Sequence, residues 1–375
     1  MHNNNTSVTS TPAPSQHSES LFELVAEAKR QVGICNACRY CEGFCSVFPA
    51  LQRLRQHDET DVIQLANLCH NCRACHYSCQ YSNPHEFQIN LPAALADVRL
   101  ESWHHYARPK LFSKAFQQHG VLIASFLIFS ITMFLVLVAK FQSTAGQGFY
   151  SYLSHSLMVL IFTPAFIGPL ALMGLSLKRY WQDIGGEKIR SLHLSNAFKQ
   201  AATMKNLSGG QGQGCNFEHQ DHYTNARRNY HHATVVGFLL CFASTSTATV
   251  LHYALNMPAP YAWYSLPKLF GVPGGILLVI GCGGLAFFKL RAESKLGAVR
   301  AWGAEMAFVL LLGATGLTGL TLYAATGTSW VSFLLSVHLA CVFSLFILLP
   351  YSKMVHGFFR LAALMREEQI KQSQR

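Results

Sequence analysis

Six apolar runs without charged residues constrain the fold of this chain more than any other feature of its sequence. They lie at about 121–139, 152–177, 233–255, 271–288, 306–325 and 331–349. A helix needs roughly 20 residues to cross the hydrocarbon core of a bilayer, which is about 30 Å thick. Of the 375 residues, 50% are hydrophobic and 13% are charged, which is too apolar for an ordinary soluble protein. The sequence therefore predicts a six-helix transmembrane bundle embedded in the lipid bilayer.

Basic residues predict how this bundle is oriented. The connections on the N-terminal side of the spans carry most of the Lys and Arg residues, whereas the opposite side carries Lys140 and Lys268. Basic residues favour the cytoplasmic side of a membrane. We therefore expect a multi-pass protein of the cell inner (cytoplasmic) membrane with its N-terminus in the cytoplasm. The net charge of +11 follows from this topology, and no nucleic acid is expected as a partner, because no basic stripe is interleaved with aromatic residues.

Ahead of the spans, the stretch CNACRYCEGFC is followed by the similar CHNCRACHYSC. Each repeats the spacing C-x2-C-x2-C-x3-C, at Cys35, Cys38, Cys41 and Cys45, and at Cys69, Cys72, Cys75 and Cys79. In two-cluster ferredoxins the first three cysteines of such a motif bind one cluster and the fourth binds the other. The predicted sets are Cys35, Cys38, Cys41 with Cys79, and Cys69, Cys72, Cys75 with Cys45, each holding one [4Fe-4S] cluster.

Other roles for the cysteines fit less well. Structural zinc sites favour two close pairs separated by a dozen or more residues, and disulfides are rare in a reducing compartment. Ferredoxins place a proline directly after the fourth cysteine, whereas Pro49 and Pro84 come later here, so the fine geometry is expected to differ. Single cysteines inside spans are expected to be inert buried thiols. Cys215, in the glycine-rich LSGGQGQGCNF, has no assigned role, and this stretch follows no strand, so a flexible or docking turn is favoured over a nucleotide-binding loop.

Histidines inside or beside the spans form a second group of candidates. Ionisable residues within a span are functional candidates by default, and neutral imidazole is the usual ligand of b-type haem. His338 and His356 are separated by five helical turns, about 27 Å, and so share a face. His231 lies about 60° around the helix from His252, and His232 lies about 160° from it.

These positions predict one or two b-type haems. The outer pair would be His252 with His338, and the inner pair would be His356 with His231 or His232. His155, at the outer end of the second span, is the third candidate for the outer site. Two alternatives stay open: interfacial histidines that sit among lipid headgroups, and histidines that form hydrogen bonds between helices.

The predicted fold is all-α: a cytoplasmic helical, two-[4Fe-4S] ferredoxin-like domain followed by the six-helix transmembrane bundle. Residues 1–20 are rich in Asn, Ser and Thr and have no basic and apolar leader pattern, so they are expected to be a disordered tail. The remaining divisions are 21–115 for the iron–sulfur domain, 116–360 for the transmembrane haem-binding domain with an inner loop at 178–230, and 361–375 for a cytoplasmic tail.

The motifs together resemble the tricarballylate utilization protein B family, also called citrate utilization protein B. The residues that carry this similarity are CNACRYCEGFCSVFPAL, LANLCHNCRACHYSCQYSNPHEFQINLPAAL, GQGCN and ARRNYHHATVVGFLLCF. The last span, HLACVFSLFILLPYSKMVHGFF, is also similar to that of the gamma subunits of respiratory nitrate reductases, where a histidine pair at this separation ligates two b haems. The family resemblance implies a carrier that takes electrons from a cytoplasmic FAD-dependent dehydrogenase, which oxidises tricarballylate to cis-aconitate, and passes them to the membrane quinone.

The expected function is electron transfer within a flavoprotein:quinone oxidoreductase system, through the clusters and the haem. The sequence shows no acid, base or nucleophile constellation for bond chemistry of its own. The alternative from another class is a tricarboxylate (citrate or tricarballylate) transporter or a regulator of uptake, but transporters typically show repeated halves. A heterodisulfide-reductase-like enzyme would be expected to contain adjacent cysteines, and the chain has none.

Overall fold

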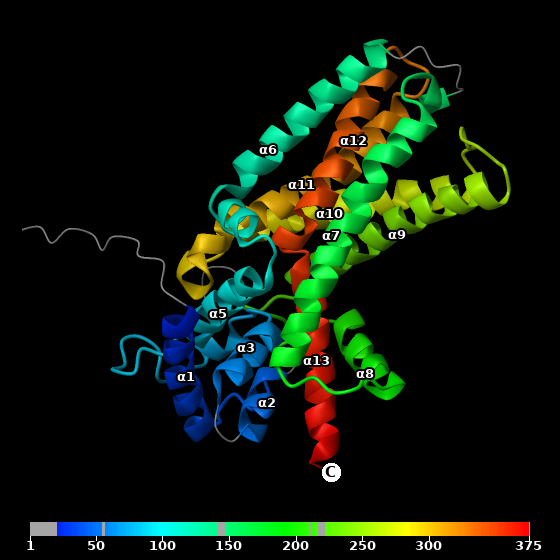
Figure 1. Ribbon diagram of the computed structural model, residues 1–375. Coiled ribbons are helices and arrows are strands. Elements are labelled where there is room, and N and C mark those ends of the chain that lie inside the picture. Colours follow the sequence, from blue (N-terminus) through cyan, green and yellow to red (C-terminus); the bar gives the residue numbers. More distant parts are fainter. Residues whose placement is uncertain (1–20, 55–56, 142–147, 210–211, 217–221, 375) are drawn as a thin grey trace, which may run out of the picture.

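The computed structural model describes residues 21–54, 57–141, 148–209, 212–216 and 222–374. The predicted disordered tail, 1–20, lies outside the described residues. The helices are α1 (Leu21–Cys38), α2 (Val47–Arg53), α3 (Glu59–Leu68), α4 (Ala74–Tyr77), α5 (Leu91–Tyr106), α6 (Lys110–Phe141), α7 (His155–Asp183), α8 (Ser191–Ala202), α9 (Ala226–Ala254), α10 (Leu266–Arg291), α11 (Trp302–Ala324), α12 (Val331–Leu348) and α13 (Val355–Ser373). The described secondary structure is helical apart from one isolated bridge between Cys215 and Thr224. The all-α prediction is confirmed (Figure 1).

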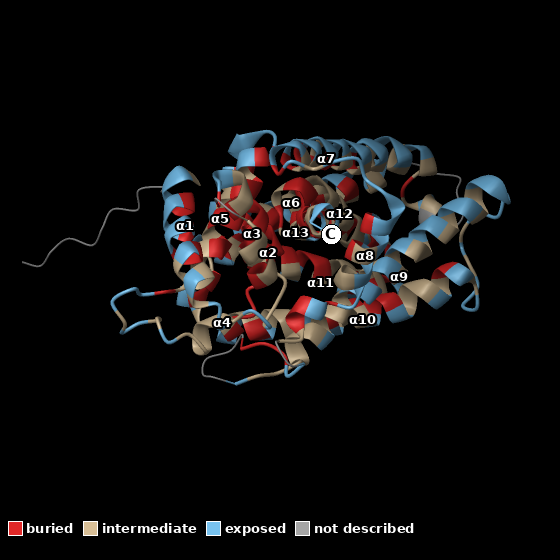
Figure 2. Cartoon of the chain, turned by 90° about the horizontal axis from the view of Figure 1, so that it is seen from below, coloured by how far each residue is buried: buried red, intermediate tan, exposed pale blue. Residues whose placement is uncertain are grey.

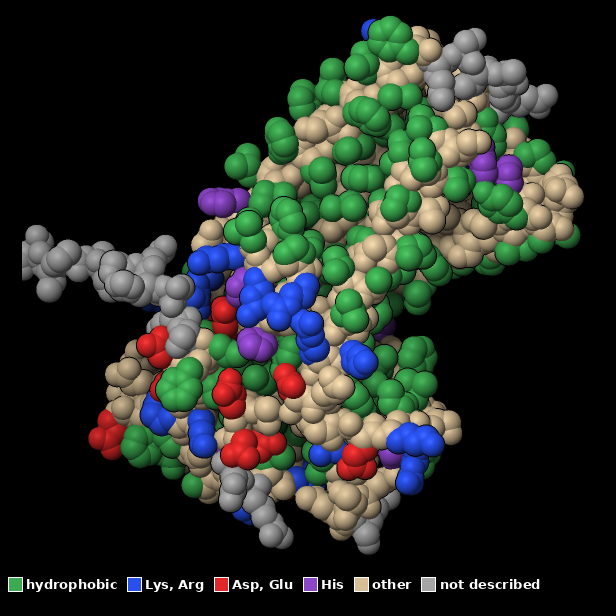
Figure 3. Space-filling view, viewed as in Figure 1, with side chains coloured by type: hydrophobic (Ala, Val, Ile, Leu, Met, Phe, Trp, Pro, Cys, Tyr) green, Lys and Arg blue, Asp and Glu red, His purple; other side chains and the backbone are tan. Residues whose placement is uncertain are grey.

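Six of these helices are long and apolar enough to cross a membrane, which confirms the predicted spans. They are Lys110–Phe141, His155–Asp183, Ala226–Ala254, Leu266–Arg291, Val299–Ala324 and Val331–Tyr351. Their outward side chains are large and apolar, such as Leu122, Phe126 and Phe129 on α6, which are 65–70% exposed. Figure 3 shows hydrophobic side chains covering the upper part of the molecule and charged side chains gathered on the lower part. This division is what a bundle surrounded by lipid requires, because apolar surface is stable in hydrocarbon and charge is not.

The cysteine-rich helices α1 to α5 form a compact unit at one end of the bundle. Leu24, Val25, Ala28 and Val32 lie on the buried face of α1, and the helix packs mainly against α5 and α3. Seen from below, buried residues concentrate in α2, α3, α5 and α13, whereas the one buried residue of α9 is Gly237 (Figure 2). The unit therefore shares one hydrophobic core with α7, α8 and α13.

The α9–α10 pair is the closest helix contact in the bundle. A Cβ atom on Gly237 would lie 2.6 Å from the backbone nitrogen of Leu278, so this glycine is what lets the two backbones approach. In Figure 1 the two helices run side by side and diverge from α6 and α12. Much of α9 therefore faces outward. Near its ends, His231 contacts His356 of α13 and His252 contacts His155 of α7.

The end of the chain differs from the division drawn from sequence. Residues 361–375 are expected as a tail, but the described part of this range continues α13 to Ser373. Phe359, Ala363 and Leu364 are at most 1% exposed, and Glu367 forms an ion pair with Arg53 of α2. The helix packs against α3, α7 and α8, so it ties the bundle to the cysteine-rich unit (Figure 1). Apolar residues on one face of a helix require such a partner.

The connection between the second and third spans also folds onto the cysteine-rich unit. It contains α8 and a 3-10 turn, Lys205–Leu207. The backbone nitrogen of Asn216 donates to the carbonyl of Cys72 at 2.9 Å, and Cys215 is fully buried beside Cys72. The part of the glycine-rich stretch that the structure describes is therefore a docking turn.

Candidate functional site

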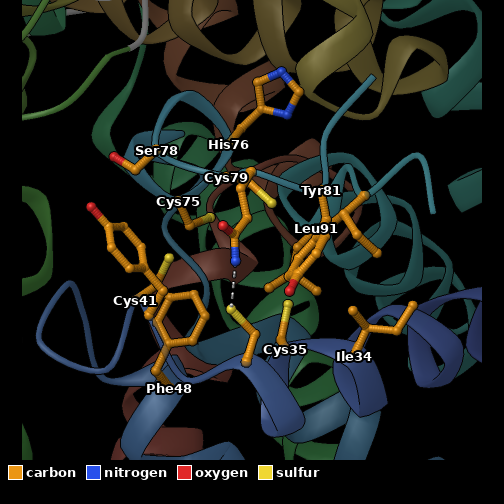
Figure 4. Close-up of a pocket in the computed structure, with 14 residues that line it drawn as sticks. Ile34, Cys35, Cys41, Phe48, Cys75, His76, Ser78, Cys79, Tyr81 and Leu91 are labelled. Atoms are coloured by element: carbon orange, nitrogen blue, oxygen red, sulfur yellow. Dashed lines mark hydrogen bonds between the residues drawn. The ribbon is translucent and has the colours of Figure 1, made fainter. Parts of the chain in front are cut away.

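The first of two neighbouring cavities gathers cysteines from both sequence motifs. It has a volume of about 220 Å³ and is lined by Cys35, Cys38, Cys41, Cys75 and Cys79 together with apolar side chains. Figure 4 shows the labelled cysteines around this cavity, with the ring of His76 pointing away from it. The side-chain amide of Gln80 donates to the sulfur of Cys38 at 3.9 Å (Figure 4). The rim carries Tyr40, whose exposed fraction of 68% shows that the cavity reaches the surface.

The second cavity is smaller and more enclosed. It has a volume of about 20 Å³ and is lined by Cys45, Cys69, Cys72 and Cys75. Asn206, from the connection after α8, covers it and accepts a hydrogen bond from the backbone nitrogen of Ser46 at 3.1 Å. Cys75 lines both cavities, so the two sites are adjacent.

The grouping of thiols matches the sets expected from the ferredoxin spacing. Cys79 joins the first three cysteines of its partner motif, and Cys45 joins the first three of the other. In the described residues no three His, Cys, Asp or Glu side chains converge on the position of a single metal ion. The thiols instead line the two cavities, and the ferredoxin spacing would assign four of them to each cluster.

Burial raises the pKa of four of these thiols, those of Cys35, Cys41, Cys45 and Cys75. It raises the pKa of the Cys35 and Cys41 thiols to about 12, with a further contribution from the neighbouring cysteines. The pKa values of Cys45 and Cys75 are raised well above the usual value for the same reason. A thiolate here needs a positively charged partner, and iron supplies that charge, so ligation would release protons.

Three arginines surround the loop that carries the second set. Arg99 of α5 donates to the carbonyl of Cys69 at 2.6 Å, and Arg360 of α13 donates to the same oxygen at 2.8 Å. Arg227, in the first turn of α9, donates to the carbonyl of Asn71 at 2.9 Å. Burial and the neighbouring Arg99 lower the pKa of Arg360 to about 9, which still leaves it charged at neutral pH. The second site is therefore the more positive of the two.

The inner pair of predicted haem ligands meets where α9 and α13 begin. The ring centroids of His231 and His356 are 5.9 Å apart with the ring planes at 85°. Nδ1 of His356 donates to the carbonyl of Lys353, which leaves Nε2 with a free lone pair. Burial and the adjacent Arg360 hold the pKa of His356 well below its usual range, so the ring is neutral. In the described residues Nδ1 of His231 is buried and has no hydrogen-bond partner. These features fit a pair of haem ligands.

His232, the other inner candidate, has a different contact. Its Nε2 donates to the carbonyl of Ala202 at 3.1 Å, which ties α9 to the end of α8. The structure therefore brings His231, and not His232, to His356.

The outer pair differs from the one ranked first by sequence. His252 stacks on His155, with centroids 4.4 Å apart and planes 11° apart. Nδ1 of His252 is buried without a hydrogen-bond partner among the described residues. His338 lies instead on the α11–α12 interface, where its Nδ1 hydrogen-bonds with the hydroxyl of Thr318 at 3.1 Å. His338 lies on α12, which packs on α11, whereas His252 lies on α9, which packs on α10. Helical spacing shows which residues of one helix share a face, but it does not show which residues of two helices meet.

A buried ion triad lies next to the inner pair. Glu305 of α11 accepts from Lys289 of α10 at 2.5 Å and from Lys353 at 2.9 Å. Lys353 is also the residue whose carbonyl binds His356. The triad fixes the segment that joins α12 to α13, and with it the position of His356.

Sequence reasoning does not find Arg99, Arg360 or Glu305 as site residues. A signal exists for Arg360, because His356 and Arg360 are four residues apart, as are Arg227 and His231. Residues four apart share a helix face. Nothing in the sequence marks Arg99 or Glu305, because their partners lie far along the chain.

Comparisons with known proteins match nearly the whole chain. The profile of the citrate utilization protein B family matches residues 115–375, and that of the citrate utilization protein B Fer4-like domain matches residues 28–105. Citrate utilization protein B from Escherichia coli is 43% identical over 352 residues, which cover 92% of each chain. No solved protein structure matches.

Proposed function

The chain belongs to the citrate utilization protein B family, and from this premise we propose that it reoxidises a cytoplasmic FAD-dependent tricarballylate dehydrogenase. Electrons pass through two [4Fe-4S] clusters and b-type haem to the membrane quinone. Family membership confirms the resemblance carried by the cysteine motifs and ARRNYHH. A Fer4-like domain attached to a multi-pass membrane protein indicates electron transfer.

One observation supports this function most strongly: the eight cysteines of the two motifs line two adjacent cavities that share Cys75. The clusters would supply one-electron carriers, and haem would supply another within the bundle. The residues of this chain hold the carriers at fixed positions. Oxidation of the reduced flavin releases two electrons and two protons, and reduction of the quinone to quinol consumes two of each.

The direction of transfer follows from the positions of the sites. The first cavity reaches the surface, where a flavoprotein can approach, and the second lies against α9 and α13, which carry the inner histidines. We place the cysteine-rich unit in the cytoplasm because the basic residues favour that side. The proposed haem ligands are His231 with His356. His155 and His252 stack face to face at 4.4 Å, which leaves no room for a porphyrin between them, and His338 serves the α11–α12 contact.

Spectroscopy of the purified full-length protein, before and after reduction with dithionite, tests this proposal. Electron paramagnetic resonance should show two reduced [4Fe-4S] signals, and the optical spectrum should show the bands of reduced b-type haem. His231→Ala and His356→Ala should each bleach haem absorbance, whereas His338→Ala should leave it. Iron-free, colourless protein that is correctly folded would sink the proposal.

A transport assay separates the proposal from the uptake alternative. Vesicles that contain this protein alone should not accumulate labelled citrate or tricarballylate. Accumulation that depends on the protein would favour a transporter.

A further inference from the structure

The inner histidines and the second cysteine site are joined by two arginines with matching positions. Arg227 lies one turn before His231 on α9, and Arg360 lies one turn after His356 on α13. Side chains four residues apart lie on the same face of a helix. Each arginine therefore extends from the histidine pair along its own helix, toward the cysteine loop.

Both arginines end on the same short loop. Arg360 donates through Nη2 to the carbonyl of Cys69 at 2.8 Å and through Nε to that of Asn67 at 3.3 Å. Arg227 donates to the carbonyl of Asn71 at 2.9 Å and to that of His70 at 3.5 Å. The guanidinium fork is a planar, pre-organised donor, so paired bonds of this kind fix both distance and direction.

The loop itself is held rigid, so the contacts define a position. The side chain of Asn71 donates to the carbonyls of Pro92 and Leu296 at 3.1 and 2.9 Å and accepts from Arg73 at 3.0 Å. Leu296 belongs to the connection between α10 and α11. The loop is therefore anchored in the cysteine-rich unit and in the bundle at once.

Charge gives these arginines a second effect. In the part of the chain that the structure describes, neither Arg99 nor Arg360 has a carboxylate within ion-pair distance. A [4Fe-4S] cluster with four thiolate ligands is anionic and gains one further negative charge on reduction. Positive charge beside the second site would therefore favour the reduced form of a cluster held there. At the first site, the arginine bond of this kind that the described residues show comes from Arg39, which is exposed and donates to the carbonyl of Asn36.

We propose that Arg227 and Arg360 are positioning residues that form the junction between the second cysteine site and the His231–His356 pair. They hold the cysteine loop at a fixed distance from the pair, and they raise the reduction potential of the second cluster above that of the first. With both sites filled, the transfer that they would serve moves one electron and no proton, from a cluster held by the second cysteine set to a haem held by His231 and His356. This inference rests on the proposed function.

The test uses full-length protein with its clusters and haem in detergent, and the variants Arg227→Gln, Arg360→Gln and Arg228→Gln. Arg228 is the matched control, because it lies beside Arg227 but donates to the carbonyl of Thr203 at 2.7 Å. A redox titration followed by electron paramagnetic resonance measures both clusters. Loss of Arg227 or Arg360 should shift the reduction equilibrium of the second cluster about tenfold toward the oxidised form, which is about 59 mV for one electron. The first cluster, and both clusters of Arg228→Gln, should titrate as in the native protein.

Stopped-flow reduction of haem by dithionite tests whether the two arginines fix the distance between the cysteine loop and the histidine pair. Haem reduction should slow in Arg227→Gln and Arg360→Gln. Arg360→Lys keeps the charge but loses the fork, so it should keep the native potential and still reduce haem slowly. If a glutamine variant does not accumulate, this lysine variant carries the test, and a native rate in it contradicts the inference.

Failure of the inference can be told from failure of the proposed function. Native protein without clusters or haem would remove the function and the inference together. Native protein that holds both, with Arg360→Gln and Arg228→Gln indistinguishable in potential and rate, would remove the inference alone.

Discussion

The two cysteine sites share one sequence pattern but lie in opposite surroundings. The first cavity is about 220 Å³, reaches the surface beside Tyr40 and is lined otherwise by neutral side chains. The second is about 20 Å³, is covered by Asn206 and is contacted by buried arginines through its cysteine loop. Equal spacing of ligands therefore does not give equal sites, because the potential of a cluster depends on nearby charge, hydrogen bonds and solvent.

Under the proposed function, the contrast assigns the two sites different tasks. An exposed site can receive electrons from a protein that docks and leaves, whereas an enclosed site beside the membrane helices can pass them on. A partner that docks from solution would therefore need to reach the first site and not the second. The four predictions below test this division, beginning with the largest effect.

Loss of one cysteine should have the largest effect, and the effect should differ between sites. Cys72→Ser should remove the second cluster and with it about half of the iron, and dithionite should then reduce haem far more slowly. Cys41→Ser should remove the first cluster and stop quinone reduction by the flavoprotein, while dithionite still reduces haem. Iron analysis and optical spectra measure both outcomes, and an unaltered iron content in either variant contradicts the ligand sets.

Arginine removal should destabilise the second site and spare the first. Arg99 is 8% exposed and donates to Cys69 and Ala66, so Arg99→Gln should cost about 2 kcal/mol, the range for hydrogen bonds from charged groups. The exposed Arg39, at the first site, is the matched control, and Arg39→Gln should change stability by less than about 0.5 kcal/mol. Thermal unfolding in detergent compares them, and equal shifts would remove the contrast in burial.

Docking of the flavoprotein should depend on the rim of the first site. Tyr40→Ser should slow cluster reduction by the dehydrogenase about fivefold or more, the effect of losing an aromatic contact worth at least 1 kcal/mol. Iron content and reduction by dithionite should not change. Phe22 is 75% exposed but lies about 20 Å from Cys35 along α1, so Phe22→Ser is the control. If both variants slow the reaction alike, docking does not centre on this rim.

The smallest effect should come from loss of the Glu368 contacts with α8, the helix that precedes Asn206 at the second cavity. Burial opposes ionisation of Glu368, but hydrogen bonds from Lys371, Gln200 and Asn196 outweigh it and lower the pKa of this carboxyl below 4.5. The bonds from Gln200 and Asn196 join α13 to α8, just before Asn206. Glu368→Gln should cost about 1 kcal/mol at pH 7.

The pH dependence of that cost has a definite sign. Because the folded pKa lies below the unfolded value, the contribution is fully present above about pH 4.5 and is lost as the pH falls through the folded value. Unfolding curves of the native protein and Glu368→Gln should therefore converge in acid. Glu86→Gln, on the exposed surface after the second motif, should match the native protein throughout.

The sequence by itself determined the six spans, the helical class and the two motifs that group eight of the cysteines. Long apolar runs have few stable structures in a bilayer other than a helix, and thiols at fixed local spacing point to one kind of cofactor wherever the chain places them. These are local properties, so they can be read without knowing which segments meet. The direction of α13 and its burial are not local, and the division at 361 therefore differed from the helix that the structure shows.

Tertiary structure alone decided which histidines meet and which cysteine site is enclosed. His252 lies against His155 because α7 and α9 approach at that end, and His338 faces Thr318 because α11 packs on α12. Arg99 and Arg360 are more than 250 positions apart in the chain, yet they reach one carbonyl. Helical periodicity fixes the direction of a side chain relative to its own axis, but the partner across the gap depends on how whole helices pack, which is set by contacts distant in sequence.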